Sequence, residues 1–100
     1  LLARPRIAAE LEEQGLHLTS FEGMDIALTP GAVAVSTDPA ILGQADLVLV
    51  TVKSGATEEM GRLIADHAPP CATIVSLQNG LINAATLRNA RLDQYRVIHL

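Results

Sequence analysis

Two residues that could take part in chemistry follow apolar segments typical of buried strands. Lys53 comes directly after residues 45–52, and Asn79 closely follows residues 72–77. Apolar runs that do not alternate with polar residues are typical of parallel strands with helices on both faces. Ligands of such sheets bind beyond the carboxyl ends of the strands. The sequence therefore places an ammonium group and an amide, both hydrogen-bond donors, at an expected ligand-binding edge.

Each of these two residues also has a purely structural interpretation. A lysine that closes a buried strand can mark the point where the chain returns to water, and Asn79-Gly80 is a common turn signal. The functional interpretation is that Lys53 donates to a cofactor ribose or phosphate, or to the carboxylate or keto oxygen of a substrate. The sequence around Asn79 argues against a hairpin turn, because a buried strand precedes it and a predicted helix follows.

Four neighbouring polar residues are expected to have mainly structural roles. The amides of Gln78 and Asn83 are expected to brace the turn at Asn79. Ser54 and Thr57 are expected to cap the next helix, with contact to a cofactor as the alternative. These residues are therefore not counted among the candidate site residues.

The elements that must position Lys53 and Asn79 follow an α/β pattern. Helices are predicted at residues 5–14, 38–42, 58–67 and about 82–90. In the third of these, one helical face carries Met60, Leu63, Ile64 and His67. Parallel strands are predicted at 45–53, at 72–77 and from 96, with an antiparallel excursion near 16–36. The order strand, helix, strand, helix, strand indicates a parallel sheet.

Composition limits the function classes that are compatible with the chain. Among 100 residues, 49% are hydrophobic and 18% are charged, which is typical of a globular domain. The net charge of −4 offers no basic field for nucleic acid, and no apolar stretch reaches the roughly 18–20 residues of a membrane span. The single cysteine, Cys71, forms no internal disulfide, which fits a reducing cytoplasm. No histidines share metal-ligand spacing, so no metal is expected.

Three segments resemble the dinucleotide-binding domain of ketopantoate reductase (2-dehydropantoate 2-reductase), an NADPH-dependent enzyme of pantothenate synthesis. Residues 1–6 resemble the end of its second strand, 52–57 its lysine segment, and 76–83 its Gln-Asn-Gly segment. The resemblance implies a Rossmann-like sheet and places Lys53 at the active site near the nicotinamide. It also implies that Asn79 binds a nicotinamide ribose or a substrate hydroxyl. The family's main proton donor is a different lysine, in a second domain.

Arg4 and Arg6 are candidates for binding the cofactor phosphate. In dinucleotide folds an acidic residue at the end of the second strand binds the ribose 2′-hydroxyl, whereas an arginine there accommodates the 2′-phosphate of NADP. No Asp or Glu precedes Glu10. The resemblance therefore implies NADPH, with Arg4 as the stronger candidate. The structural alternative for both arginines is a solvated helix entrance.

The glycine-rich loop of dinucleotide-binding folds is missing from this sequence. None of the seven glycines forms a Gly-x-Gly-x-x-Gly motif. In the family this loop follows the first strand, whereas residues 1–6 resemble the end of the second. We therefore expect residues 1–100 to be part of an NADP-binding Rossmann-like domain, without the family's helical substrate domain.

The resemblance implies hydride transfer from NADPH to the keto carbon of ketopantoate, a small-molecule substrate, to give pantoate. Two alternatives stay open. One is a non-catalytic cofactor-binding or truncated module, and the other is a related reductase that acts on another keto or hydroxy acid. A homodimer is compatible with the sequence, which does not fix the oligomeric state.

Overall fold

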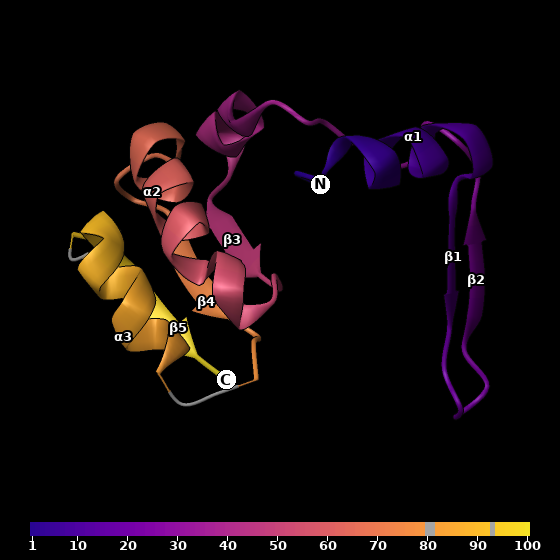
Figure 1. The fold of residues 1–100 in the computed structure, drawn as a ribbon. Coiled ribbons are helices and arrows are strands. Elements are labelled where there is room, and N and C mark those ends of the chain that lie inside the picture. The colour runs from indigo at the N-terminus through magenta and orange to yellow at the C-terminus, as the bar shows by residue number, and fades with distance from the viewer. Residues whose placement is uncertain (80–81, 93) are drawn as a thin grey trace. The chain divides into compact units, whose positions relative to one another are not determined.

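Two structural units make up the chain in the computed structural model (Figure 1). The structure describes residues 1–79, 82–92 and 94–100. The first unit is Leu1–Asp38 and the second is Pro39–Leu100.

The first unit begins with helix α1 (Pro5–Gln14), as the sequence predicts. Proline occupies the first helical position, where its missing N–H costs no hydrogen bond. The helix ends at Gly15, which has a φ of 76°. A Cβ at this position would lie 2.1 Å from the carbonyl oxygen of Leu28. Glycine is therefore required here both by the backbone conformation and by the close approach of the next segment.

A β-hairpin follows α1 and confirms the predicted antiparallel excursion. Strands β1 (Leu16–Thr19) and β2 (Asp25–Leu28) pair antiparallel, with Leu16 opposite Leu28. The extended run expected up to Ser36 forms no further strand in the described chain; it contributes one isolated parallel bridge between Leu2 and Ser36. The excursion is therefore a single hairpin.

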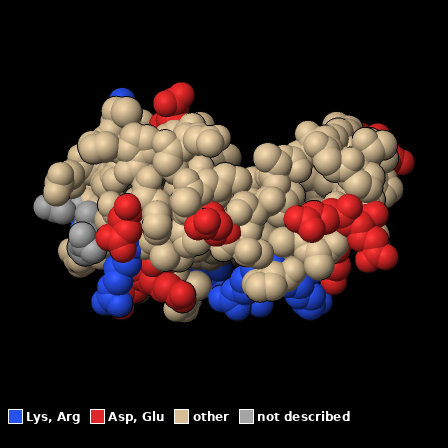
Figure 2. All heavy atoms as spheres, turned by 90° about the horizontal axis from the view of Figure 1, so that it is seen from above, with Lys and Arg blue, Asp and Glu red and all other residues tan. Residues whose placement is uncertain are grey.

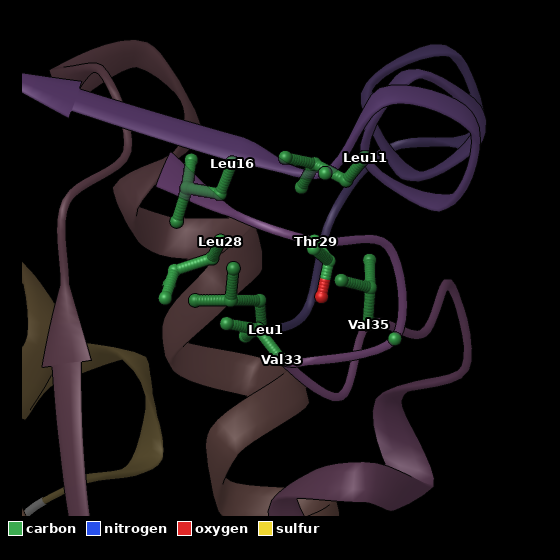
Figure 3. Close-up of a pocket in the computed structure, with 9 residues that line it drawn as sticks. Leu1, Leu11, Leu16, Leu28, Thr29, Val33 and Val35 are labelled. Carbon is green, nitrogen blue, oxygen red and sulfur yellow. The ribbon is translucent and has the colours of Figure 1, made fainter. Parts of the chain in front are cut away.

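Apolar side chains of the first unit gather at one end of the hairpin. Figure 3 shows leucines and valines from α1, the hairpin and the following segment around a small pocket, which is lined by Leu1, Leu11, Gly15, Leu16, Leu28, Thr29, Gly31, Val33 and Val35. Toward the other end of the hairpin, Leu18, Met24 and Ile26 are exposed, and Phe21 is fully exposed. The packed part of this unit is thus the end of the hairpin next to α1.

The second unit is built around a three-stranded parallel sheet, as predicted. Its strand order is β3-β4-β5, so each strand pairs with the next one along the chain. The elements in order are η1 (Pro39–Gln44), β3 (Leu47–Val50), η2 (Ser54–Ala56), α2 (Thr57–His67), β4 (Thr73–Ser76), α3 (Asn83–Leu87), the π-helical η3 (Arg88–Leu92) and β5 (Arg96–His99).

Helices cover one face of this sheet (Figure 1). Val48, Ile74 and Val97 are aligned across the three strands and are all buried. On the opposite face, Leu47 and Leu49 are each 54% exposed. Within this unit the helices that follow β3 and β4 pack on the same side of the sheet (Figure 1), so the expectation that helices cover both faces of β3 is confirmed for one face and stays a prediction for the other.

Helix α2 packs closely against η3. The fully buried residues of α2 include Thr57 and Ile64, with Gly61 between them on the same face. A Cβ added at Gly61 would lie 2.7 Å from the Ala90 Cβ, so glycine permits the close approach. The predicted stripe of Met60, Leu63, Ile64 and His67 is only partly correct: the face that is buried most deeply is shifted toward Thr57 and Gly61, and the other stripe residues are half-buried.

Figure 2 shows one face of the molecule with its charged side chains coloured by sign. Acidic side chains occur at several separate places, and uncharged residues form most of that face. Among the helices within the described residues, none combines the length and apolar character that a membrane span requires.

Candidate functional site

The carboxyl ends of β3 and β4 lie side by side and open into a pocket. Val50 pairs with Ser76, and the Leu77 N–H donates to the Val50 carbonyl at 3.1 Å. The loops after these two strands line the pocket with Thr51, Val52, Lys53, Ser54, Leu77, Gln78 and Asn79. The structure therefore brings Lys53 and Asn79 to one pocket, although they are 26 positions apart in the sequence.

Lys53 is held at the backbone, while its side chain is left available. It has extended backbone angles (φ −64°, ψ 149°), and its carbonyl accepts a 2.9 Å hydrogen bond from the Ala56 N–H in the short turn η2. The residue is exposed. Among the described residues, no carboxylate pairs with its ammonium group. A ligand in the pocket would therefore meet a cation that no neighbouring carboxylate neutralises.

Asn79 shows the same division between a fixed backbone and an available side chain. Its carbonyl accepts two hydrogen bonds, from Asn83 Nδ2 at 2.6 Å and from Ser54 Oγ at 3.2 Å. The residue is exposed, and its own amide forms no hydrogen bond with the part of the chain that the structure describes. That amide can offer a ligand both a donor and an acceptor.

A buried hydrogen-bond network connects the two loops. Gln78 Nε2 donates to the Val52 carbonyl at 2.9 Å and to Thr57 Oγ1 at 2.7 Å. Thr57 Oγ1 donates in turn to Asn83 Oδ1 at 3.2 Å. Gln78, Thr57 and Asn83 are 6%, 0% and 2% exposed. The loop after β3 is thus tied to the loop after β4 by side chains that bulk water does not reach.

The network extends from Gln78 back into the sheet. Ser76 Oγ donates to Gln78 Oε1 at 3.0 Å, and His99 Nδ1 lies 3.2 Å from the same serine oxygen. In the described part of the chain, no buried side-chain nitrogen or oxygen lacks a hydrogen-bond partner. The polar groups behind the pocket therefore form a satisfied network, which is the condition under which buried polar groups fix a single conformation.

The neighbouring polar residues agree only in part with the sequence predictions. The bracing roles of Gln78 and Asn83 are confirmed. The capping role of Ser54 and Thr57 is wrong, because Ala56 occupies the N-cap of α2 and the cap has no side-chain hydrogen bond. Both hydroxyls instead belong to the network around Asn83.

One sequence signal could have identified Thr57 as a buried residue. It precedes Ile64 by seven positions, so both lie on the same face of a helix. Gly80 and Leu81 of the predicted Gln-Asn-Gly segment lie outside the described residues.

Arg4 and Arg6 belong to the first unit, at the start of α1. Arg4 is the N-cap residue, with extended backbone, and is exposed. Within the described ranges no carboxylate pairs with Arg4, whereas the Arg6 guanidinium lies 3.6 Å from Glu10 Oε1 one turn along the helix. Of the two candidates, Arg4 is thus the one whose charge has no acidic partner.

The remaining ionisable residues form no further candidate site. No group of three or more His, Cys, Asp or Glu side chains in residues 1–79, 82–92 and 94–100 could hold a metal ion. His17 pairs with Asp25 on the exposed hairpin, and Cys71 is an exposed free thiol. The pocket beside Lys53 and Asn79 is therefore the place where available polar side chains converge.

Comparison with known proteins identifies similar sequences and structures. The family model described as ketopantoate reductase PanE/ApbA matches residues 1–99. A 2-dehydropantoate 2-reductase of Halobacterium salinarum is 38% identical over 77 residues, which are 77% of this chain and 24% of that protein. The chain thus spans about a quarter of the length of this curated relative.

Two solved structures have the same fold as this chain. A PanE/ApbA family ketopantoate reductase from Ralstonia eutropha JMP134 matches with a TM-score of 0.81 and 35% identity, over 96% of this chain and 30% of that one. A 2-dehydropantoate 2-reductase from Geobacter metallireducens GS-15 matches with a TM-score of 0.70 and 32% identity, over 88% of this chain and 28% of that one. These similarities span both structural units.

Proposed function

Because the chain belongs to the ketopantoate reductase PanE/ApbA family, as its sequence motifs predicted, we propose that it is part of the cofactor domain of an NADPH-dependent 2-dehydropantoate 2-reductase. The observation that carries this proposal is the pocket in which Lys53 and Asn79 present available side chains beyond two adjacent parallel strands. The proposal concerns the complete protein, since the chain spans only 24–30% of the three relatives named above.

The residues of the pocket fit a nicotinamide nucleotide. Ribose hydroxyls both donate and accept hydrogen bonds, and phosphates accept them, so the ammonium of Lys53 and the amide of Asn79 are suitable partners. The position beyond the carboxyl ends of parallel strands is the usual binding place in such sheets. When bound, NADPH supplies the hydride for the reduction of the keto carbon.

Lys53 and Asn79 have complementary roles in this proposal. The ammonium of Lys53 attracts either the substrate carboxylate or the keto oxygen. In the second case it also stabilises the negative charge that develops on the keto oxygen. The amide of Asn79 orients a ribose or substrate hydroxyl through one donor and one acceptor. According to the family resemblance, the proton donor to the product alkoxide is a lysine outside this chain.

Arg4 is proposed to select NADPH over NADH. Its guanidinium can donate two hydrogen bonds to a phosphate in a fixed geometry. Arg6 is the weaker candidate because Glu10 already partly neutralises its charge. The 2′-phosphate is the only group by which the two cofactors differ, so an arginine that binds it acts on cofactor choice.

The first experiment measures NADPH oxidation by the complete protein with 2-dehydropantoate, in the wild type and in Lys53→Ala and Asn79→Ala variants. We expect Lys53→Ala to lower kcat/KM by about 10²–10³, the usual effect of removing one donor to a developing oxyanion. Asn79→Ala is expected to lower kcat/KM by about tenfold, the effect of about one hydrogen bond to a hydroxyl. Arg62→Ala is the matched control, because Arg62 is exposed on α2 and, among the described residues, pairs with Glu58 alone. Wild-type turnover that persists in both site variants would contradict the assigned roles.

The outcome for the wild type also separates the alternatives. NADPH binding without turnover of 2-dehydropantoate would favour a related reductase, and turnover of another keto or hydroxy acid would then distinguish it from a non-catalytic cofactor-binding module. Absence of NADPH binding would favour a non-catalytic module.

Cofactor choice is tested separately with Arg4→Ala and Arg6→Ala. Loss of a charge-assisted contact to the 2′-phosphate costs about 1.5–3 kcal/mol, so we expect the NADPH to NADH preference to fall about 10- to 100-fold in Arg4→Ala. The Arg6→Ala variant is expected to change this ratio less. An unchanged ratio in Arg4→Ala would remove Arg4 from the cofactor site.

A further inference from the structure

We propose that Thr57 is a positioning residue of this site. Its buried hydroxyl links the Gln78 amide to the Asn83 amide, which holds the main chain at Asn79, and so keeps the Lys53 and Asn79 loops in one arrangement. The effect on ligand binding depends on the proposed function above, whereas the effect on the ligand-free site does not.

The direction of the network is fixed at one end by the carbonyl of Val52. This carbonyl only accepts hydrogen bonds, so the group of Gln78 that faces it at 2.9 Å must be the NH₂ group. The same NH₂ group donates to Thr57 Oγ1 at 2.7 Å. The Thr57 oxygen therefore accepts from Gln78, and its single proton is left for another partner.

That proton determines the direction of the second half of the network. Thr57 donates it to Asn83 Oδ1 at 3.2 Å, which leaves Nδ2 of the same amide directed to the Asn79 carbonyl at 2.6 Å and to Ser54 Oγ at 3.2 Å. The Asn79 carbonyl is again only an acceptor. The network thus runs between the Val52 carbonyl in one loop and the Asn79 carbonyl in the other. Between these ends, the Thr57 hydroxyl joins the side-chain amides of Gln78 and Asn83.

Burial makes this link difficult to replace with water. Thr57 is 0% exposed and Asn83 is 2% exposed. Thr57 is also the first residue of α2, where its branched Cβ restricts the side chain to few rotamers. A residue that lacks the hydroxyl but keeps the shape would break the link between the two amides, because Gln78 Nε2 would lose one acceptor and Asn83 Oδ1 would lose the Thr57 donor.

The test compares Thr57→Val, which removes the hydroxyl at constant shape, with Thr57→Ser, which keeps it. Thr86→Val is the control, because in the described part of the chain the hydroxyl of this half-buried residue of α3 donates to the Ile82 carbonyl and takes no part in the network. The measurements on the complete protein are kcat and KM for 2-dehydropantoate, the Kd of NADPH, and amide hydrogen exchange of the ligand-free protein.

For Thr57→Val we expect KM or the NADPH Kd to rise on the order of tenfold, the effect of about one hydrogen bond. We also expect faster exchange that is confined to the loops at 52–56 and 77–79. Thr57→Ser is expected to restore values close to the wild type, and Thr86→Val to leave them unchanged.

Several outcomes would overturn the proposal. If Thr57→Val keeps the wild-type KM, Kd and exchange, the hydroxyl does not position the site. If Thr57→Ser is as impaired as Thr57→Val, loss of the hydroxyl is not the cause of the impairment. If kcat per mole of protein falls at constant KM and exchange accelerates throughout residues 39–100, Thr57 supports folding only. If the wild type shows no reductase activity, the exchange data alone still decide whether Thr57 holds the two loops.

Discussion

The close packing of α2 against η3 gives a stability prediction that can be worked out from one distance. A Cβ at position 61 would lie 2.7 Å from the Ala90 Cβ, whereas carbon atoms pack comfortably at about 3.5–4.0 Å. In a Gly61→Ala variant, the two elements must therefore separate by about 1 Å. Overpacking of this kind costs about 1–3 kcal/mol. Alanine is about 1 kcal/mol more favourable than glycine within a helix, which offsets part of that cost.

A double-mutant cycle separates the steric cost from helix propensity. It compares Gly61→Ala, Ala90→Gly and the double variant, so the propensity changes of the single variants cancel. We expect the double variant to be more stable than the sum of the single effects by about 1–3 kcal/mol. The assay is urea unfolding of the complete protein, followed by circular dichroism.

The result that would refute this reasoning is additivity within about 0.5 kcal/mol. Gly43→Ala is the control, because a Cβ there would meet the His67 carbonyl oxygen at an ordinary distance of 3.6 Å. A loss of stability in Gly43→Ala equal to that in Gly61→Ala would show that glycine replacement in general, and not contact with Ala90, is responsible.

Two further predictions concern the free energy of unfolding. Gly15→Ala should destabilise the protein by at least about 1 kcal/mol more than Gly23→Ala, since both glycines have positive φ but only Gly15 has the Leu28 carbonyl against it; equal losses in urea unfolding would contradict the steric argument. Tyr95→Phe should cost about 1 kcal/mol, because the Tyr95 hydroxyl donates to the Ala68 carbonyl at 2.7 Å; an unchanged unfolding midpoint would show that this bond adds no net stability.

Local sequence signals predicted the elements that they determine directly. Pro5 and Gly15 mark the two ends of α1, and the apolar runs marked the three parallel strands. Which face of the sheet the helices of this unit cover could not be predicted in the same way. The residues of β3 are apolar at every position, so nothing in their order shows that Leu47 and Leu49 lie on the less covered face.

For the candidate site, the sequence likewise predicted which segments meet but not the contacts between them. Parallel strands end at the same edge, so the proximity of Lys53 and Asn79 followed from the predicted topology. The role of Thr57 did not, because a threonine before a helical segment is usually a cap, and its actual partner is Asn83, 26 positions away. Hydrogen bonds between distant segments depend on packing, which local patterns do not encode.

The strand order β3-β4-β5 also bears on how the sheet is assembled during synthesis. Paired residues are separated by 26 positions between β3 and β4 (Leu47 and Thr73) and by 23 between β4 and β5 (Thr73 and Arg96). Among the three strands of this sheet that the structure describes, none has to insert between two strands that have already paired. At a translation rate of about 5–20 residues per second, β4 is available to β3 for about 1–5 s before β5 is complete. The sheet can therefore grow at one edge as the chain emerges from the ribosome, and Ser54, Thr57 and Gln78 are synthesised before the helix that carries Asn83, the partner of Ser54 and Thr57.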